Sequence, residues 1–428
     1  MKKQIPVEDV TTGMYISELD RPWTETPFLF QGFKITNDNQ INELRKRCTY
    51  VYIDIELGED VSPTQANSGF QQRMQVLKEK EKTLNKKFDQ LISETKVKPK
   101  RYNLPKTEPY VDKKSFEEEL ATAKKIESDA RVAIRAALES IRNRKTINLE
   151  AARKVITNMA DSVLRNPDAL MCLSQLKELS EYTALHSIRC AIIGLAFGRH
   201  LVLPRDELIE LGMGLLLHDV GMAMLPPRIL DKNGPLDEKE FKIMESHIAW
   251  SLRILEQSGG VSGIVQEITT QHHERWDGTG YPNRLIEDRI TLFGSIGAIV
   301  DVYDAVTSER TYGDPMSAEE ALKKMYEWRD KDFNGELIEE FIRCMGIFPI
   351  GSLVELSTGA IGVVVTINRS RRLKPKVALV LTANKTPLTH RSIIDLSARV
   401  LGEDDIKINR VLPVGTHSIN PMDHLVTL

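Results

Sequence analysis

The chain has 428 residues, of which 41% are hydrophobic and 28% charged, a composition typical of a globular protein with roughly two to three domains. Its formal net charge of −3 argues against a protein that coats a nucleic-acid polymer, because such binding normally needs a basic field. The four cysteines are scattered without a CxxC pair, which indicates neither a zinc ribbon nor a disulfide framework.

Residues 1–62 predict a small β-rich domain. Short β-branched or aromatic runs at 14–16, 28–30 and 50–55 are separated by turn residues, and a short helix is expected at 41–47. The N-terminus has no apolar signal-peptide core, and no stretch approaches the roughly 20 apolar residues of a membrane helix. We therefore expect a cytoplasmic protein without a membrane partner.

Residues 63–146 predict a helical and irregular linker. Charged helices are expected at 70–95 and 115–144, on either side of a Pro- and Lys-rich stretch, and Ser115 and Glu118 have capping-box spacing. Solvated helices that connect two domains are the plainer interpretation. The alternative is a signalling or dimerisation segment, so a homodimer or a signalling protein bound through the N-terminal domain and these helices is a hypothesis.

Residues 147–347 have helical periodicity almost throughout, and 348–428 form a small β-rich segment with strands expected at 352–356, 362–367 and 377–381. Cys190 and Cys344 lie in apolar helical contexts and are expected to be buried thiols. The predicted fold class is therefore mainly α. It combines an all-helical core with a β-rich N-terminal domain, a helical linker and a β-rich C-terminal tail.

The helical block holds six of the nine histidines, and five of them lie with two aspartates in a pattern that suggests metal ligands: His186, His218, Asp219, His247, His272, His273 and Asp301. Any one of these histidines alone is more simply a hydrogen-bonded core or surface residue. An aspartate within an apolar helix, however, is costly unless it is paired or binds a metal. Imidazole and carboxylate ligands suit iron, manganese or zinc without choosing among them. Their charge of about −2 would become about +2 with two divalent ions, which suits an anionic phosphodiester.

Several separated motifs in this block resemble the HD-GYP family, a branch of the HD phosphohydrolase superfamily. The motifs are His-Asp-Val-Gly at 218–221, His-His-Glu at 272–274, Asp-Gly-Thr-Gly-Tyr-Pro at 277–282, and the stretch 301–310. The resemblance covers about residues 147–345. The first 60 residues resemble the uncharacterised N-terminal domain that often precedes HD-GYP modules.

The resemblance implies metal-dependent hydrolysis of cyclic di-GMP to the linear dinucleotide pGpG, in some members onward to GMP, in bacterial signalling. It implies that the seven residues above bind two divalent ions, with His218 and Asp219 at the catalytic centre and Asp219 between the ions. Iron or manganese is favoured, and zinc, nickel or magnesium are alternatives. Some family members bind a third ion through a glutamate four residues before the first histidine, where this chain has Tyr182.

The resemblance also assigns residues around the metals. Arg310 would bind a phosphate with its charged fork, and Gly280 and Tyr281 would bring their loop against the substrate, with Asp304 as a further contact. Glu274 and Asp277 would order the loop and support the ligands. For the loop glycines, a plain tight turn is the alternative.

Three departures from the family pattern keep other functions open. Met222 replaces a usual lysine, Gly313 replaces a usual basic residue, and Ser251 stands where glycine is frequent. The lost cations would weaken binding or turnover of an anionic substrate. The alternatives are a catalytically weak or inactive sensor of cyclic di-GMP and an HD hydrolase of another cyclic nucleotide.

Overall fold

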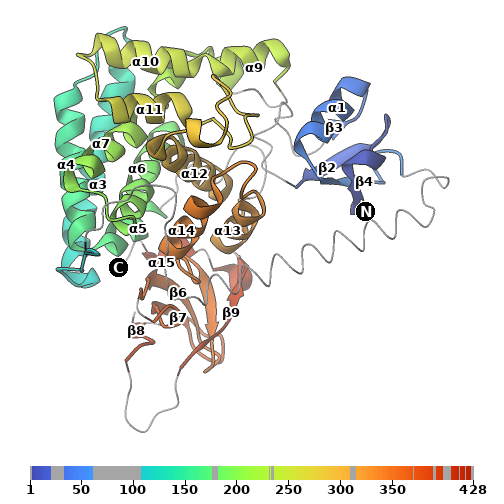
Figure 1. Ribbon diagram of the computed structural model, residues 1–428. Coiled ribbons are helices and arrows are strands. Elements are labelled where there is room, and N and C mark those ends of the chain that lie inside the picture. The colour runs from blue at the N-terminus through green and yellow to red at the C-terminus, as the bar shows by residue number, and fades with distance from the viewer. Residues whose placement is uncertain are drawn as a thin grey trace. The chain divides into compact units, whose positions relative to one another are not determined.

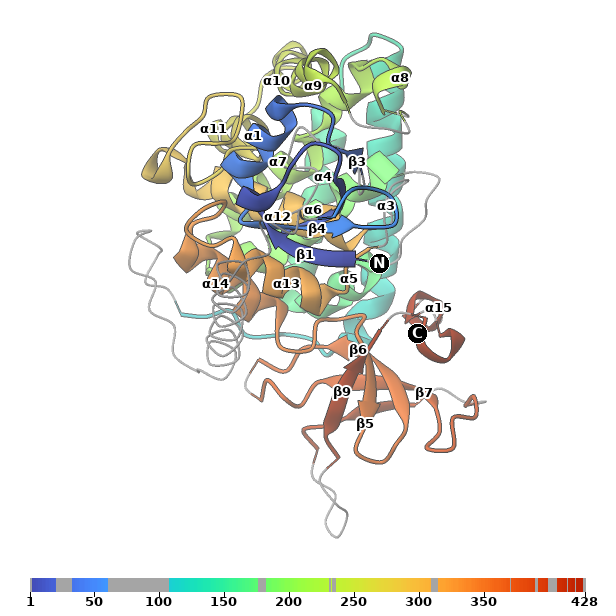
Figure 2. The ribbon, with the colours of Figure 1, turned by 90° about the vertical axis from the view of Figure 1, so that its right-hand side faces the viewer.

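The computed structural model describes residues 2–20, 33–60, 108–175, 182–230, 232, 236–308, 315–369, 371–388, 392–398, 406–413, 415–419 and 421–425. The expected strand at 28–30, the expected helix at 70–95, and Arg310 and Gly313 lie outside these residues. The chain divides into two compact units (Figures 1 and 2). One comprises Met1–Ser93, Leu225–Glu245 and Arg310–Asp314, and the other comprises Glu94–Met224, Ser246–Glu309 and Pro315–Leu428.

The first unit contains a four-stranded antiparallel sheet in the order β1-β4-β2-β3. The bounds are β1 (Lys2–Pro6), β2 (Tyr15–Leu19), β3 (Phe33–Lys34) and β4 (Tyr50–Asp54), with a 3₁₀ turn at Val7–Asp9 and the helix α1 (Asp38–Arg47). Alternating residues such as Ile16 and Ile53 are fully buried with Leu44 of α1, as expected for a sheet with one covered face. The unit also holds α8 (Pro227–Leu230) and α9 (Glu238–Glu245).

The second unit is mainly helical before its C-terminal sheet. Its helices are α3 (Phe116–Arg142), α4 (Leu149–Arg165), α5 (Pro167–Ser174), α6 (Tyr182–His200), α7 (Arg205–Leu217), α10 (His247–Gln257), α11 (Gly263–Gln271), α12 (Leu292–Thr307), α13 (Ala318–Glu327), α14 (Gly335–Met345) and α15 (Pro421–Leu425). Short 3₁₀ turns lie at Val220–Met224, Glu287–Arg289 and Thr416–Ser418. The capping box predicted for Ser115 and Glu118 is confirmed, with reciprocal bonds of 3.2 and 2.8 Å at the start of α3.

Four apolar helices form the centre of this unit. α7 packs against α6 and α11, and α12 packs against the same two helices. Buried aliphatic side chains dominate α6, α7 and α12, and Val265 and Ile268 of α11 are buried against them, which stabilises the packing by removing apolar surface from water. Polar side chains at the ends of these helices are thereby held at fixed positions next to one another.

The C-terminal sheet has the order β8-β7-β6-β5-β9, and all neighbours are antiparallel. Its strands are β5 (Leu353–Leu356), β6 (Ile361–Thr366), β7 (Lys376–Leu381), β8 (Ile393–Asp395) and β9 (Ile408–Leu412), and β6 is buried along its whole length. Asp168 of α5 accepts hydrogen bonds from Ile367 N (2.9 Å) and Arg369 Nη2 (2.6 Å), which joins this sheet to the helices.

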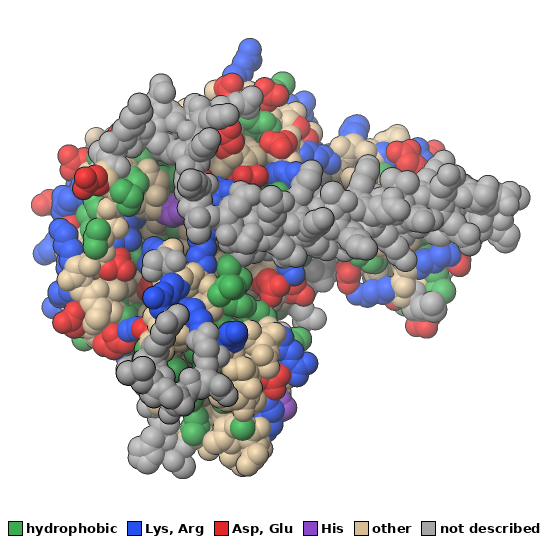
Figure 3. All heavy atoms as spheres, turned by 60° about the horizontal axis from the view of Figure 1, so that its bottom comes forward, with side chains coloured by type: hydrophobic (Ala, Val, Ile, Leu, Met, Phe, Trp, Pro, Cys, Tyr) green, Lys and Arg blue, Asp and Glu red, His purple; other side chains and the backbone are tan. Residues whose placement is uncertain are grey.

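These elements confirm the predicted fold class: a mainly α protein with a helical core and a small sheet near each end. All four cysteines are described, and each is a buried free thiol, as predicted for Cys190 and Cys344. None of the described helices is both long and apolar enough to span a membrane. Acidic and basic side chains are interspersed over the described surface in Figure 3, in keeping with a net charge near zero.

Candidate metal centre

The structure brings all seven predicted metal ligands together in the helical unit. They lie on α6 (His186), directly after α7 (His218 and Asp219), at the first position of α10 (His247), directly after α11 (His272 and His273) and on α12 (Asp301). Their ligand atoms form two groups, and the atoms of each group lie within 4.8 Å of one another. Helix ends suit this arrangement because the chain can turn there without breaking a hydrogen-bonded ladder.

Gly221 explains how the 3₁₀ turn after α7 approaches α10 at the centre. A Cβ atom at this position would lie 2.1 Å from His247 O and 2.5 Å from Ser251 N, so only glycine fits beside the start of α10. Its amide donates to Ser251 Oγ at 2.8 Å. The serine that departs from the family pattern is therefore accommodated, because it satisfies a buried main-chain donor.

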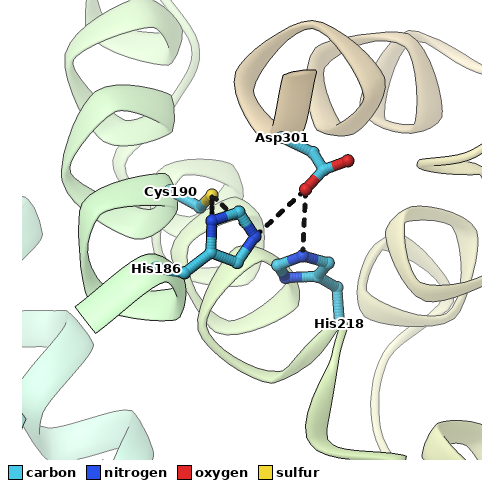
Figure 4. A group of neighbouring side chains, drawn as sticks. All are labelled: His186, Cys190, His218 and Asp301. Carbon is cyan, nitrogen blue, oxygen red and sulfur yellow. Dashed lines mark hydrogen bonds and ion pairs between the residues drawn. The ribbon is translucent and has the colours of Figure 1, made fainter. Parts of the chain in front are cut away.

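The first group joins α6, α12 and the end of α7 (Figure 4). His186 Nε2 lies 3.0 Å from Asp301 Oδ1, and His218 Nε2 lies 3.8 Å from the same oxygen. Cys190 Sγ is near, but it lies 3.7 Å from both ring nitrogens of His186. These equal distances place the sulfur beside the ring rather than in line with Nε2. Burial also raises the pKa of the Cys190 thiol to about 12, so we do not count it as a ligand.

Asp219 lies between the two groups. Its Oδ2 is 3.6 Å from His218 Nε2 and 4.0 Å from His186 Nε2. Its Oδ1 is 3.3 Å from His247 Nε2 and 3.4 Å from His272 Nε2. One carboxylate thus presents a separate oxygen to each group of imidazoles, which is the arrangement required of a bridging ligand.

Hydrogen bonds on the far side of three rings direct their Nε2 atoms into the centre. The Nδ1 atom of His218 contacts Leu215 O at 2.8 Å, and that of His272 contacts Ile268 O at 3.0 Å. The Nδ1 atom of His186 contacts the Asp304 carboxylate at 2.7 Å. Because carbonyls and carboxylates only accept, each Nδ1 carries a proton, which leaves Nε2 as the nitrogen whose lone pair a cation would take.

Two buried atoms at the centre lack hydrogen bonds. His218 Nε2 and Asp219 Oδ1 have no hydrogen-bond partner among the described residues, although both are fully enclosed. Such orphaned atoms cost free energy unless another group binds them. Burial alone would raise the pKa of Asp219, but the nearby His218, His272 and His247 rings outweigh burial and hold that pKa well below its usual range. The donor set therefore fits a bound cation.

His273 is the most accessible of the five imidazoles, with 18% of its side chain exposed, whereas those of His218, His247 and His272 are fully buried. Burial, together with the His272 ring, holds the pKa of His273 well below its usual range, so the imidazole is neutral and able to act as a ligand. His273 therefore marks the most accessible side of the centre.

The glycine-rich loop lies against this accessible side. The Tyr281 ring stacks on the His273 ring, with centroids 4.6 Å apart. A Cβ atom on Gly280 would lie 2.4 to 2.5 Å from the main chain of residues 273–275, so the loop depends on glycine there. Glu274 accepts the amides of Asn283 (2.7 Å) and Leu285 (2.9 Å). The glutamate thereby closes the loop onto the centre.

Asp277 lies at the start of the same loop, where its main chain pairs with Ile286, and its side chain is exposed. Its Oδ1 accepts the amide and the hydroxyl of Thr279, at 2.9 and 2.6 Å, which is a local turn contact. Both expected loop-ordering residues thus bond to the loop itself. Met222 is half-buried in the 3₁₀ turn after Asp219, and the side chain of Tyr182 lies outside the described set, as does Arg310.

The structure does not support a substrate contact for Asp304. This side chain is 1% exposed, and both of its oxygens are engaged by Arg189 and His186. Asp304 therefore bonds to the proposed ligand His186, on the side of its ring away from the centre, and is not available to a substrate. Sequence reasoning also missed Arg189. The available signal was a lone arginine within the apolar stretch of α6, since a buried arginine requires a carboxylate partner.

Three family descriptions match the chain. Residues 2–152 match a domain of unknown function (DUF3391), residues 171–337 match the HD domain, and residues 353–411 match a KOW domain associated with the HD domain. The first match contains the N-terminal sheet and α3, the second contains most of the helical core with all seven proposed ligands, and the third contains most of the C-terminal sheet.

Among curated relatives, the chain is 32% identical over 398 residues to the cyclic di-GMP phosphodiesterase PA4108 of Pseudomonas aeruginosa, and the match covers 92% of this chain and 89% of that protein. It is 32% identical over 209 residues to a cyclic di-GMP phosphodiesterase of Thermotoga maritima, covering 48% and 56%. It is 32% identical over 191 residues to the 3'3'-cGAMP-specific phosphodiesterase 2 of Vibrio cholerae, covering 44% and 34%.

Proposed function

This chain belongs to the HD-GYP family of HD-domain phosphodiesterases, and we propose that it hydrolyses a phosphodiester bond of cyclic di-GMP with two divalent metal ions. Family membership and the near full-length match to PA4108 support the reaction. The observation that carries the two-ion proposal is Asp219, which presents one oxygen to each group of imidazoles.

The residues divide between the two ions according to the distances above. One ion would be held by His186, His218, Asp219 and Asp301, and the other by Asp219, His247, His272 and His273. The orphaned His218 Nε2 and Asp219 Oδ1 support this fit. When bound, such ions act as Lewis acids toward a phosphoryl oxygen and lower the pKa of a water nucleophile.

The residues of the chain would hold and orient the reacting groups. Asp219 and Asp301 fix negative charge at the centre, where burial excludes bulk water and strengthens electrostatic interactions. Tyr281 would face the substrate beside His273, and Gly280 would let the loop approach it. Arg310 would bind a phosphate through its fork of donors.

The donor set also bears on the metal and the product. Nitrogen and oxygen ligands without a coordinating sulfur favour iron or manganese, with zinc, nickel and magnesium as alternatives. Hydrolysis of one of the two phosphodiester bonds opens the ring to linear pGpG, which we propose as the product. The Met222 and Gly313 departures would affect the rate rather than the reaction, because all seven proposed ligands are present.

The test is a hydrolysis assay with the full chain reconstituted with Mn²⁺ or, without oxygen, with Fe²⁺. We expect cyclic di-GMP to be converted to pGpG, as followed by anion-exchange chromatography, and we expect Asp219→Ala to abolish conversion. Asp161→Ala is a matched control, because Asp161 is an exposed carboxylate paired with Arg205. If the chain carries two ions per molecule and binds cyclic di-GMP without cleaving it, the protein is a sensor and the proposal is wrong. If 3'3'-cGAMP is hydrolysed faster than cyclic di-GMP at equal concentration, the proposed substrate is wrong and 3'3'-cGAMP replaces it.

A further inference from the structure

We propose that Arg189 and Asp304 form a positioning pair that sets the ring of His186 for metal binding, an inference that rests on the proposed metal centre. Asp304 lies on α12, three residues after Asp301, and Arg189 lies on α6, three residues after His186. Arg189 Nε donates to Asp304 Oδ1 at 2.6 Å, and Nη2 donates to Oδ2 at 2.9 Å. The two side chains are 5% and 2% exposed.

The pair determines which nitrogen of His186 is available. Asp304 Oδ2 accepts the Nδ1 proton of His186 at 2.7 Å. With the Nδ1 proton held by Asp304, Nε2 is the nitrogen directed toward the proposed ligand Asp301, whose Oδ1 lies 3.0 Å away. An asparagine at 304 has an NH₂ group that can donate to Nδ1, and this would favour the tautomer with its proton on Nε2, which cannot bind a metal.

Arg189 is required because a lone buried carboxylate would be costly and free to rotate. The planar guanidinium engages both oxygens at once, which fixes the carboxylate plane as well as its charge. The same Nη2 atom also donates to Ser308 Oγ at 3.1 Å, at the end of α12. Arg189 thus ties the helix that carries His186 to the helix that carries Asp301.

His186 differs in this respect from two other rings of the centre. His218 and His272 direct their Nδ1 protons to main-chain carbonyls three and four residues earlier, at Leu215 and Ile268. Helix geometry alone therefore orients those two rings. The orientation of His186 depends on side chains, so substitutions at Asp304 or Arg189 should weaken the ion held by the first group and spare the other ion.

The test is a titration of metal-free full-length protein with Co²⁺, followed by visible absorption, which yields the dissociation constants of both ions without substrate. We expect Asp304→Asn and Arg189→Met to weaken one ion by about 10- to 100-fold, as is typical when a partner of a ligand histidine is lost, and to leave the other unchanged. Arg189→Lys keeps the charge but loses the fork, so we expect a smaller loss.

The matched control is Arg165→Met. Arg165 Nε and Nη2 bond both oxygens of the buried Glu119, at 2.8 and 2.6 Å, in the same fork geometry but away from the proposed ligands. We expect this variant to unfold at lower temperature and to keep both Co²⁺ constants. If Asp304→Asn and Arg189→Met also keep both constants, the pair is merely structural and the inference is wrong.

Failure of the proposed function is distinguishable from failure of this inference. A wild-type chain that binds two Co²⁺ ions but does not cleave cyclic di-GMP would contradict the function, while the variant titrations would still decide the positioning role. A wild-type chain that binds fewer than two Co²⁺ ions would overturn both the two-ion centre and the selective effect proposed for this pair.

Discussion

Two buried carboxylates of the scaffold, Glu119 and Asp168, differ from that of Asp219 in the groups that surround them. Glu119 receives two hydrogen bonds from Arg165, and Asp168 is paired with Arg369, so each scaffold carboxylate has its own cation. Asp219 is surrounded by histidine side chains, which can be neutral, unlike arginine. Its Oδ1 has no hydrogen bond among the described residues. A buried acid that faces histidines rather than an arginine marks a place for an added cation.

Asp304 sharpens this comparison. It lies beside the metal centre, but like Glu119 and Asp168 it is paired with an arginine. Its pairing with Arg189 distinguishes a supporting acid from the proposed ligands Asp219 and Asp301. The partner of each acid, rather than its distance from the centre, separates the two roles. Substitution of a proposed ligand should therefore affect function, substitution of Asp304 should affect metal affinity through His186, and substitution of a scaffold acid away from the centre should affect stability.

The largest effect is expected for Asp219→Asn. The amide keeps the shape of the side chain but loses the charge presented to both groups of imidazoles. Hydrolysis of cyclic di-GMP should fall by on the order of 10²- to 10³-fold, the loss typical when one preorganised charge is removed from a reacting centre. Steady-state kinetics measure this. Activity within twofold of wild type would show that Asp219 is a scaffold acid after all.

A smaller effect on activity is expected for Gly280→Ala. The added methyl group would overlap the main chain of residues 273–275 and displace the loop from His273. A displacement of about 1 Å near a reacting centre costs about 10²-fold in rate. Gly263→Ala is the matched control, because no described atom lies within 4 Å of the position that its new methyl group would occupy. Equal activity of both variants would contradict the role of the loop.

Asp168→Ala should affect stability and leave turnover nearly intact. The substitution removes the acceptor of Ile367 N and of Arg369, whose side chain is 38% exposed and can still reach water. We expect a loss of about 1–3 kcal/mol in the free energy of unfolding, the usual cost of an unsatisfied buried group. Urea unfolding measures it. A strong loss of turnover at a temperature where the variant is folded would contradict the assignment of Asp168 to the scaffold.

The smallest effect is a pH-dependent one at Glu119. Burial alone would raise the pKa of this carboxyl group, but hydrogen bonds from Arg165 and Ser162 outweigh burial and hold it below the ordinary value of 4.5. The pair therefore stabilises the fold fully above pH 4.5, and this contribution is lost as the pH falls through the lowered pKa. The stability gap between wild type and Glu119→Gln should shrink on acidification, as urea unfolding at several pH values would show. A constant gap would contradict the lowered pKa.

Much of the fold and of the site was predictable from sequence. Apolar periodicity indicated the central helices, and alternating runs indicated both sheets. The seven histidines and aspartates were found because their residue types and motif order are unusual for a structural core. The structure adds their grouping around the two oxygens of Asp219, a three-dimensional relation among five separate elements that linear spacing does not encode.

The sequence did not predict contacts between residues that are distant in sequence. Asp304 was expected at the substrate from the family resemblance, yet its side chain bonds to Arg189, 115 residues away. Ser251 departs from the family pattern, and only the structure shows that its hydroxyl accepts the Gly221 amide. In both cases the role depends on which helices pack together, and helix periodicity does not determine that.

The most direct test of the central claim is anomalous diffraction from crystals of the full chain soaked with Mn²⁺. The account predicts two anomalous peaks about 3.5–4 Å apart, on opposite sides of the Asp219 carboxylate, one beside His186 and His218 and the other beside His247 and His272. A single peak, or two peaks that do not share Asp219, would contradict the bridging role on which the proposed function rests.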